Sequence, residues 1–486
     1  MSKKFFARML IGGELVEASD GKAMESINPA TEDIHGYAPI ASQADVARAV
    51  DAGEAAWPDW VARPVGERIR VMNRLADAIL ARRSEIAELE SLDTGNLYRA
   101  MLDDVERAAG RIRYFASLGH GIYGTTYPAT SDHIHLTLRE PYGTVARIVA
   151  FNHPFYFLAS RLGAPLIAGN SIVIKSPDQA PLSGGLLAEI CREVLPAGLV
   201  NIISGTGAVS GDALVRDKRI KRIGFVGSVN TALAIQKATA ESSVKVITHE
   251  LGGKNSMIVL PDADVEFAAW HAVKGMNFEW QGQSCGSTSC LLVHESLYDA
   301  VLERVCELVR DICVGDPFDA ATGMGPLISA AHHKKVTSAI QRGIDEGAKL
   351  EVGGGRPEGA RFEKGYWVQP TVFSSVAPDS FLATEEIFGP VLSVMKWSRH
   401  EEVLGIDRRS SLGLTAAIIG KDISIATAMA RRLRVGYVWI NCVGPHYVGV
   451  PCGGYKNSGA GREEGIEEVL SYTEIKAINI STPAIV

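Results

Sequence analysis

The stretch Gly282–Gly286 reads Gly-Gln-Ser-Cys-Gly and places a cysteine among small residues, just before a predicted strand. Small neighbours leave the sulfur of Cys285 free to face a cleft, where its thiolate could attack a carbonyl carbon. The thiolate needs a favourable environment, because free cysteine has a pKa of about 8.5. An inert core cysteine is the alternative that the local sequence leaves open.

Two further segments supply a base and a hydrogen-bond donor. Glu250 follows a predicted strand and lies among apolar residues and glycines, where burial would raise its pKa into the range of a general base. A surface ion pair with Lys254 is the alternative. Asn152 follows another strand, and its amide could hold a developing oxyanion, although asparagine there is more often a cap or turn residue. The neighbouring His153 has no partner in the sequence that would make it a base.

Three loops have the composition of a dinucleotide site. Gly205–Gly211 is rich in glycine, Phe225–Ser228 opens a predicted helix, and Lys175–Asp178 ends a strand with a lysine and a carboxylate. Glycines and a helix start favour phosphate, and the charged pair could bracket ribose hydroxyls. A tight turn, a serine N-cap and a surface lysine are the alternatives. The residues expected to contact the cofactor in these loops are Lys175, Asp178, Gly207, Gly211, Phe225, Gly227 and Ser228.

Short apolar strands alternate with helical stretches from residue 144 onward, which predicts parallel βαβ units in a doubly wound sheet. Ligands of such sheets bind beyond the carboxyl ends of the strands, where these loops lie. The predicted strands are Thr144–Ala150, Ser171–Lys175, Val200–Ser204, Arg222–Val226 and Val244–Thr248. The helices between them are predicted near 156–168, 182–194, 208–217 and 230–241.

A second alternating block over about 256–440 predicts another α/β unit. Its strands are expected at Ser256–Leu260, Thr288–Val293, Leu392–Val394, Leu414–Ile419 and Gly436–Ile440. A 3.6-residue period predicts one long helix over Pro64–Asp93, stopped by Gly95. Period-two alternation predicts a half-buried strand at 132–139 and another strand at Leu470–Ile480. The pair His133 and His135 lies on one face of the first of these, which favours an ordinary strand face over a metal site.

The composition excludes several classes of protein. The chain has 486 residues and a net charge of −7, which gives no electrostatic case for binding nucleic acid or an anionic membrane. No apolar run reaches the roughly 18 residues of a membrane span. The 7 scattered cysteines include no Cys-x-x-Cys pair, which argues against a zinc site or disulfide framework and favours a reduced, cytoplasmic compartment.

Together, the motifs resemble the aldehyde dehydrogenase superfamily nearly from end to end. The most specific part is Glu250-Leu251-Gly252-Gly253-Lys254 followed by Gly282-Gln283-Ser284-Cys285. The other matching segments are Asn152 with Pro154, Lys175, Phe225–Ser228, Glu386–Val391, Asn441 and Gly453–Gly459.

The resemblance implies a role for each matching residue. Cys285 would add to the aldehyde carbon, Asn152 and the Cys285 amide would hold the oxyanion, and Glu250 would activate the water that hydrolyses a thioester. Lys175 and Glu386 would hold the two riboses, and Gly227 and Ser228 the pyrophosphate. Leu251 and Phe388 complete the implied cofactor set. Asp178 stands where a longer glutamate is usual, so NAD is favoured while NADP stays plausible.

The substrate is less determined, because the sequence departs from the family near the expected aldehyde channel. Phe151 stands where tryptophan is common, His153 where another aromatic is usual, and Cys452 where phenylalanine is usual. Aromatic walls suit an aromatic or medium apolar aldehyde. The expected pocket residues are His153, Phe157, Trp280, His446 and Cys452, with Phe155 as a further candidate that could equally pack in the core. Arg161 could meet a substrate carboxylate, although a helix-surface position is the commoner one.

The implied fold class is α/β: a doubly wound parallel-sheet dinucleotide-binding domain, an α/β catalytic domain and a small β oligomerisation arm. The predicted bounds are 1–121 with 142–251, then 252–455, and 122–141 with 466–486 for the arm. The implied assembly is a homodimer or homotetramer, and no metal is expected. Three other functions stay open: an acyl-CoA-forming relative, a non-catalytic binding protein on this fold, and a cofactor-free cysteine hydrolase. The presence of Glu250 argues against the first, and the complete Cys285, Glu250 and Asn152 set argues against the second.

Overall fold

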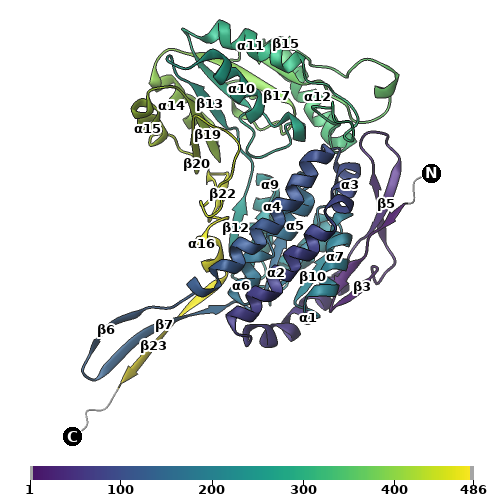
Figure 1. Ribbon diagram of the computed structural model, residues 1–486, viewed down its shortest axis with the longest axis vertical. Helices are drawn as coiled ribbons and strands as arrows, with labels where there is room; N and C mark the ends of the chain where they lie inside the picture. The colour runs from purple at the N-terminus through teal and green to yellow at the C-terminus, as the bar shows by residue number, and fades with distance from the viewer. Residues whose placement is uncertain (1–3, 482–486) are drawn as a thin grey trace.

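The structure is a computed structural model that describes residues 4–481. It consists of a body built on one large sheet, a lobe built on a second sheet, and a thin arm that projects away from both (Figure 1). Residues 1–3 of the predicted first segment and residues 482–486 of the predicted arm lie outside the described residues. No helix in the described part of the chain is both long and apolar enough to cross a membrane.

The sheet of the body has eight strands in the order β22-β12-β11-β8-β9-β10-β2-β3. Its five central strands are parallel and the outer ones run antiparallel to their neighbours. The order shows the doubly wound arrangement that the sequence predicts, with a switch point between β8 and β11. The strands are β8 (Thr144–Ile148), β9 (Ser171–Lys175), β10 (Val200–Ile203), β11 (Arg222–Val226), β12 (Val246–Glu250), β2 (Met9–Ile11), β3 (Glu14–Val16) and β22 (Gly459–Ala460).

Helices cover both faces of this sheet because successive strand residues point to opposite sides. In β9, Ile172 and Ile174 belong to the core under one helix layer, and Val173 belongs to the core under the other. The first layer contains α2 (Val65–Ala81), α3 (Arg83–Thr94), α4 (Tyr98–Ser117), α5 (Pro154–Ser160), α6 (Gly163–Ala168) and α7 (Ser183–Val194). The second contains α1 (Gln43–Val61), α8 (Asp212–Arg216) and α9 (Val229–Ala240).

Two helices that the periodicity predicts as continuous are each divided. The 64–93 helix breaks at Arg82, whose φ of −108° leaves the helical range, and Gly95 ends the second part in the left-handed region with φ of +78°. The 156–168 helix breaks before α6. Pro165 has no N–H to donate to the previous turn, so one helix cannot run unbroken through this position.

Two predicted boundaries are also shifted. The fifth parallel strand of the body along the chain is β12 (Val246–Glu250), so Glu250 is the final residue of a strand and does not follow it. The helix expected at 208–217 is shorter, because residues Gly207–Gly211 form one wide turn before α8.

The lobe contains a seven-stranded sheet in the order β15-β16-β17-β14-β13-β19-β20, parallel except at β15. The five predicted strands are present, and β15 and β16 were not predicted. The strands are β13 (Ser256–Val259), β14 (Cys290–His294), β15 (Lys349–Val352), β16 (Thr371–Ser374), β17 (Val391–Trp397), β19 (Thr415–Ile419) and β20 (Tyr437–Ile440). Its helices are α10 (Val265–Gly275), α11 (Tyr298–Arg310), α12 (Ala330–Asp345), α13 (Phe381–Thr384), α14 (His400–Arg409) and α15 (Ile423–Ala430).

The arm is a three-stranded antiparallel sheet with β7 in the middle. Its strands are β6 (Thr126–Thr130), β7 (His133–Pro141) and β23 (Thr473–Ser481). The sequence prediction is wrong at one end: Ile466–Leu470 forms the short helix α16 against the body, and the strand begins only at Thr473.

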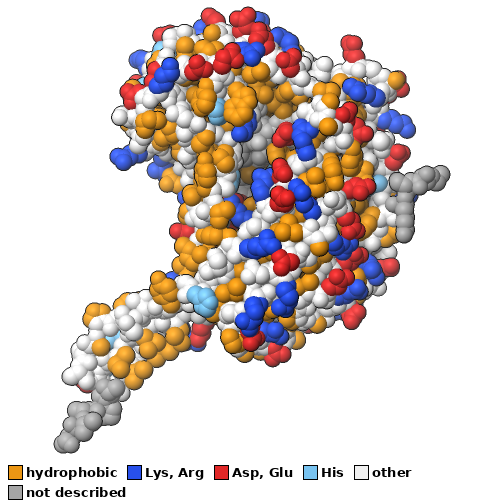
Figure 2. Space-filling model, in the orientation of Figure 1, with side chains coloured by type: hydrophobic (Ala, Val, Ile, Leu, Met, Phe, Trp, Pro, Cys, Tyr) orange, Lys and Arg blue, Asp and Glu red, His pale blue; other side chains and the backbone are white. Residues whose placement is uncertain are grey.

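Two small sheets complete the described part of the chain. The strands β1 (Phe5–Phe6), β4 (Ala23–Ile27) and β5 (Ile34–Pro39) form a small sheet beside the body. The strands β18 (Leu412–Gly413) and β21 (Tyr455–Lys456) pair near the boundary between lobe and body. On the face drawn in Figure 2 the surface is hollowed between the lobe and the long helices of the body.

Candidate active site

Cys285 lies in the loop between α10 and β14, and its backbone is held by one buried asparagine. The side-chain amide of Asn255 donates to the carbonyl of Cys285 at 2.6 Å and to that of Ser287 at 3.0 Å. The side-chain oxygen Oδ1 of Asn255 accepts from the Thr415 backbone N–H at 3.0 Å, which links the loop to the strand β19. The side-chain hydrogen bonds of Asn255 therefore fix the position of the Cys285 loop.

The tight turn before Cys285 requires glycine. Gln281 and Gly282 both have positive φ angles, of +54° and +67°. A Cβ at Gly282 would lie 2.3 Å from the carbonyl oxygen of Gly389, a backbone atom that cannot move aside. The turn thus brings the loop of Cys285 against the segment that contains Glu386.

Glu250 ends β12 with one carboxylate oxygen, Oε1, buried and without a hydrogen-bond partner among the described residues. Burial raises the pKa of this carboxyl well above its usual value, and the charge of Glu463 raises it further, while Arg161 opposes both. A carboxyl group with a raised pKa is a stronger base once it has lost its proton. The environment expected from the sequence is therefore present, and no ion pair with Lys254 forms.

The thiol of Cys285 lies close enough to Glu250 for their charges to interact. Burial raises the pKa of Cys285 to about 12, and the carboxylates of Glu386, Glu250 and Glu464 contribute in the same direction. The protein alone therefore keeps the sulfur protonated at neutral pH. A positive charge brought near the sulfur would favour the thiolate.

Asn152 is buried at the start of α5, between β8 and the helix. Its backbone carbonyl accepts from the side-chain amide of Asn96 at 3.1 Å. Glu90 holds the next turn, because its carboxylate accepts from the Phe155 N–H at 3.0 Å. No protein group in the described chain hydrogen-bonds the side-chain amide of Asn152, so its donors are free for a ligand.

The loops expected to hold a dinucleotide lie at the carboxyl ends of neighbouring strands in the body. Lys175 ends β9, and burial lowers the pKa of its amine to about 8, against the opposing charge of Asp178. Its Nζ donates to the Ser176 carbonyl at 2.9 Å. Gly211 faces the stem of Lys175, since a Cβ there would lie 3.8 Å from the lysine Cδ, while Gly207 borders open space.

The next loop is built around Phe225. A Cβ at Gly227 would lie 2.5 Å from the Phe225 ring, so glycine permits the ring to cover this turn. Ser228 is the N-cap of α9 and accepts from the Thr231 N–H at 3.3 Å, as the ordinary-cap alternative expects. This cap does not occupy the remaining N–H groups at the helix start, which favour a phosphate.

Glu386 approaches the same region from the lobe. Its carboxylate accepts from the Gly253 N–H at 2.9 Å, and a Cβ at Gly252 would collide with it. Leu251, just before this turn, is buried in the core of the body. Phe388 has a φ of +61°, and its carbonyl faces the His332 ring nitrogen at 2.6 Å. Glu386 of the lobe therefore contacts the turn that follows β12 of the body.

The expected channel residues form two groups. His153 lies among aromatic rings, with its ring centroid 5.2 Å from that of Trp280 and 5.6 Å from that of Phe157. Phe155 is fully buried in the core of the body, so its core alternative is correct. In the second group, Cys452 is buried and pairs through its backbone with Glu463, and His446 contacts Glu464.

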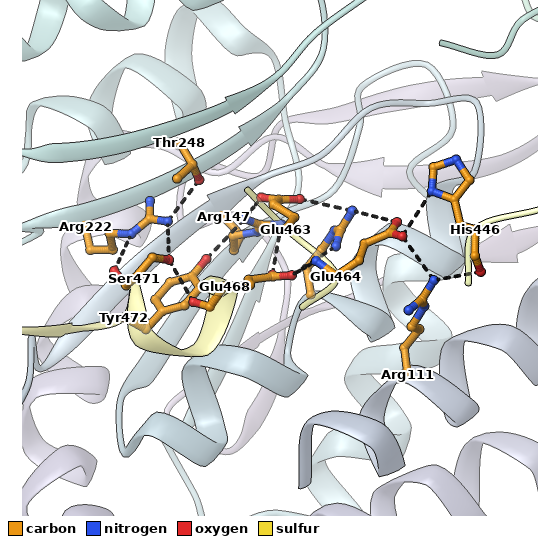
Figure 3. A network of polar contacts seen from close by, with 11 residues as sticks. Arg111, Arg147, Arg222, Thr248, His446, Glu463, Glu464, Glu468, Ser471 and Tyr472 are labelled. Carbon is orange, nitrogen blue, oxygen red and sulfur yellow. Dashed lines mark hydrogen bonds and ion pairs between the residues drawn. The ribbon is translucent and has the colours of Figure 1, made fainter. Parts of the chain in front are cut away.

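A buried ion-pair network lies behind the second group and was missed by the sequence reasoning (Figure 3). Arg147 Nη1 donates to Glu463 at 2.6 Å and to the Tyr472 hydroxyl at 3.1 Å. Arg161 pairs with Glu463 at 3.0 Å and with Glu468 at 3.4 Å. The favoured helix-surface position for Arg161 is therefore wrong, because its side chain is 5% exposed and ion-paired.

The signal for this network in the sequence is faint. Glu463, Glu464 and Glu468 lie close together near the C-terminus, whereas Arg111, Arg147 and Arg161 come from three separate elements. Charged residues are usually solvated, so only the fold identifies them as buried partners. Burial would raise the pKa of Glu464, but His446, Arg161 and Arg111 together hold it at about 2.

Two other expectations concern cysteines and histidines. All seven cysteines lie in the described part of the chain, and each is a free thiol. On the arm, His135 contacts Asn479 at 2.7 Å and His133 contacts Asp132 at 3.1 Å. Among residues 4–481, no group of three or more metal-ligating side chains comes together.

The site combines a thiol, a buried carboxyl group and a free amide at the boundary between a dinucleotide-type sheet and a second lobe. Residues 15–478 match the model of the aldehyde dehydrogenase family. Aldehyde dehydrogenase tropH of Talaromyces stipitatus is 43% identical over 464 residues, which cover 94% of this chain and 90% of that protein.

Two further relatives match over nearly the whole chain. The mitochondrial benzaldehyde dehydrogenase of Antirrhinum majus is 36% identical. The match covers 97% of this chain and 88% of that protein. An aldehyde dehydrogenase from Bacillus cereus, solved as its NAD+ complex, superposes with a TM-score of 0.94 at 37% identity, over 98% of this chain and 96% of that one. The predicted resemblance and the α/β fold class are confirmed, and the chain belongs to the aldehyde dehydrogenase family.

Proposed function

We propose that this protein oxidises an aldehyde to a carboxylate, with Cys285 as nucleophile and Glu250 as the base that activates water. The observation that carries the proposal is the unpartnered, buried Oε1 of Glu250 within charge-interaction range of the Cys285 thiol. A buried carboxyl group without a partner is costly, and such costs concentrate at functional sites.

NAD is the proposed cofactor, and the residues at the carboxyl ends of β9, β11 and β12 suit it. Lys175 and Glu386 would hold the riboses, and Gly227, Ser228 and the start of α9 would hold the pyrophosphate. When bound, the oxidised cofactor supplies a positive nicotinamide ring and accepts a hydride. The exposed Asp178 is shorter than the glutamate usual at this position, which leaves room for a 2′-phosphate and keeps NADP as the second candidate.

The chain's residues divide the reaction into two steps. Cys285 gives its proton to solvent water and its sulfur adds to the aldehyde carbon, while the Asn152 amide and the Cys285 N–H stabilise the oxyanion. After hydride leaves that carbon, the substrate remains on the sulfur as a thioester. Glu250 then takes a proton from water as the oxygen attacks, the carbon–sulfur bond breaks, and the carboxylate product leaves.

An aromatic aldehyde is the proposed substrate class. His153, Tyr156, Phe157 and Trp280 form a cluster of rings in mutual contact beside the loop of Cys285. Flat rings pack against such walls in offset or edge-to-face geometry. The benzaldehyde dehydrogenase named among the relatives is in keeping with this class.

Three alternative functions are less well supported. Passing the acyl group to coenzyme A needs no base for water, so the buried Glu250 favours hydrolysis. A non-catalytic protein would not need a nucleophile, base and amide kept together. A cofactor-free cysteine hydrolase leaves Lys175, Glu386 and the glycine loops without a role.

We further propose a homo-oligomer, dimer or tetramer, that assembles through the arm in the cytoplasm. The outer strands β6 and β23 have free edges, and Ile134, Leu138 and Ile475 on the arm are 43%, 43% and 63% exposed. Exposed strand edges with apolar side chains favour pairing with another chain. On this view residues 1–121 with 142–251 bind the cofactor, and 252–455 carry the nucleophile.

The test of the function is cofactor reduction with benzaldehyde, with the product identified as benzoate. The Cys285→Ala variant is expected to bind NAD as the wild type does and to reduce none of it. The exposed Cys313→Ala variant serves as the matched control and should keep full activity. Turnover that persists in Cys285→Ala, or a thioester product that forms only with coenzyme A, contradicts the proposal.

A further inference from the structure

His153 is oriented by a buried carboxylate. Its Nδ1 lies 2.7 Å from Oδ2 of Asp104, whose side chain is only 3% exposed. A carboxylate can only accept a hydrogen bond, so Nδ1 carries the proton in this pair. The opposite ring nitrogen, Nε2, has no hydrogen-bond partner among the described residues, and the His153 side chain is 17% exposed. Nε2 is therefore free to bind a ligand.

His446 repeats this arrangement on a different element. Its Nδ1 lies 3.0 Å from Oε2 of Glu464, and the same carboxylate accepts from Arg111 Nη2 at 3.0 Å (Figure 3). Arg111 also donates to the His446 carbonyl at 3.3 Å, and the imidazole stacks on Tyr437 at 5.4 Å. The His446 side chain is 32% exposed, and its Nε2 too has no protein partner in the described chain.

One helix supports both histidines. Asp104 and Arg111 are buried residues of α4, about two helical turns apart and hence on the same face. Tyr156 lies between the two pairs: its ring is 6.2 Å from that of His153, and burial together with the charge of Glu464 raises its pKa to about 12. Both histidine–carboxylate pairs therefore lie in one region, around Tyr156.

This region adjoins the nucleophile. Trp280, which contacts the His153 ring, precedes Cys285 in the same loop. Glu464, which orients His446, is close enough to Cys285 for its charge to raise the pKa of the thiol. One histidine therefore contacts the loop of Cys285, and the carboxylate that orients the other lies within charge-interaction range of its thiol.

We propose that His153 and His446 select an aromatic aldehyde that carries a ring hydroxyl group. This inference rests on the function proposed above and specifies its substrate. A hydroxyl group both donates and accepts hydrogen bonds, so it pairs with Nε2 whether the imidazole is neutral or protonated. An unsubstituted ring would leave Nε2 desolvated and unpaired, which is penalised.

A ring carboxylate fits this region less well. It can pair only with a protonated imidazole, and the carboxylates of Asp104 and Glu464 lie directly behind the two rings. The guanidinium groups nearby are already engaged: Arg107 pairs with Asp104, and Arg111 and Arg161 pair with Glu464. A hydroxyl group adds no charge to this balanced arrangement.

The first experiment compares kcat/KM for benzaldehyde, 3-hydroxybenzaldehyde, 4-hydroxybenzaldehyde, 4-methoxybenzaldehyde and 4-carboxybenzaldehyde with NAD. At least one hydroxylated substrate is expected to exceed benzaldehyde by about tenfold, the effect of one good hydrogen bond. The methoxy compound, which has the oxygen but no donor, should rank near benzaldehyde. A preference for the carboxylated substrate overturns the inference.

Variants assign the preference to the two rings. His153→Phe and His446→Phe keep a flat ring and remove Nε2, so the ratio of hydroxylated to plain substrate should fall toward one in at least one of them. His120→Phe, at an exposed position, should keep the wild-type ratio. A ratio that stays high in both channel variants overturns the inference.

Binding separates this inference from the proposed function. In Cys285→Ala with NAD present, titration calorimetry should show about tenfold tighter binding of the preferred hydroxybenzaldehyde than of benzaldehyde. Equal binding and equal turnover overturn the hydroxyl preference while aldehyde oxidation stands. Absence of cofactor reduction with every aldehyde overturns the proposed function instead, even if the hydroxylated compound binds more tightly.

Discussion

Glu250 and Glu464 are both largely buried glutamates near the Cys285 thiol, yet their pKa values shift in opposite directions. Burial and the charge of Glu463 raise the pKa of Glu250, whereas His446, Arg161 and Arg111 overcome the effect of burial and hold that of Glu464 at about 2. Burial has the same sign at both sites, so the difference comes from the partners. Glu250 Oε1 has no partner among the described residues, whereas Glu464 is ion-paired with Arg111 and His446.

The largest expected effect comes from removing the unpaired carboxyl group. Glu250→Gln should slow thioester hydrolysis by about 10²–10⁴-fold, the usual contribution of a general base. Hydride transfer precedes that step, so a stopped-flow trace should show a full burst of reduced cofactor followed by slow turnover. Loss of the burst would show that Glu250 acts before deacylation and would contradict its proposed role in thioester hydrolysis.

The next largest effect is expected on stability, when the buried ion-pair network of Arg147 is broken. Arg147→Met should lower the free energy of unfolding by about 3 kcal/mol, because the carboxylates of Glu463 and Glu468 lose a buried partner. Chemical denaturation measures this. The double variant Arg147→Met with Glu463→Met should recover part of the loss, since it removes the uncompensated charge as well. A loss below about 1 kcal/mol would place this network among weak surface pairs.

The two glutamates should also give opposite slopes of stability against pH. The pKa of Glu464 is lowered in the fold, so its stabilisation is present above the unfolded value of 4.5 and is lost as the pH falls toward about 2. The pKa of Glu250 is raised, so the folded state holds its proton longer and stability declines as the pH rises above 4.5.

Melting temperatures across pH test this pair of signs. Glu464→Gln should flatten the acid side of the profile, and Glu250→Gln should flatten the decline toward neutral pH. If both substitutions change the same side of the pH profile, the opposite pKa shifts of the two glutamates are refuted.

The smallest effect is expected at the surface. Arg216 pairs with Asp212 at 2.9 Å and with Glu241 at 3.0 Å, but all three side chains are more than two-fifths exposed. Solvent screens such pairs and side-chain entropy opposes them. Arg216→Met should therefore leave the denaturation midpoint unchanged within error. A shift comparable with that of Arg147→Met would mean that burial does not explain the difference in stability contribution between the buried and the exposed ion pairs.

Much of the fold could be predicted because local sequence encodes it. Apolar strand runs such as Ser171–Lys175 and the helix that Gly95 stops follow directly from residue pattern and backbone preference. The breaks at Arg82 and before Pro165 were missed, since the hydrophobic period continues through both. The strands β15 and β16 were missed as well, because short strands at the side of a sheet carry little pattern.

The site divides in the same way. Cys285, Glu250 and Asn152 could be named because each stands in a motif whose residue types match a chemical task. The burial of Arg161 and Glu464 could not be predicted, because a charged side chain is solvated in most proteins and nothing local shows otherwise. The roles of His153 and His446 depend on Asp104 and Glu464, which are far from them in the chain.

The sequence by itself determined the family, the alternating α/β order and the three groups proposed to react, because these depend on residue type and short-range spacing. Only the tertiary structure decided which carboxyl groups are paired. Arg111, Arg147 and Arg161 lie on α4, on β8 and between α5 and α6, and the fold brings them to glutamates near the C-terminus. Electrostatic energy depends on distance and local dielectric, and neither exists until the chain has folded.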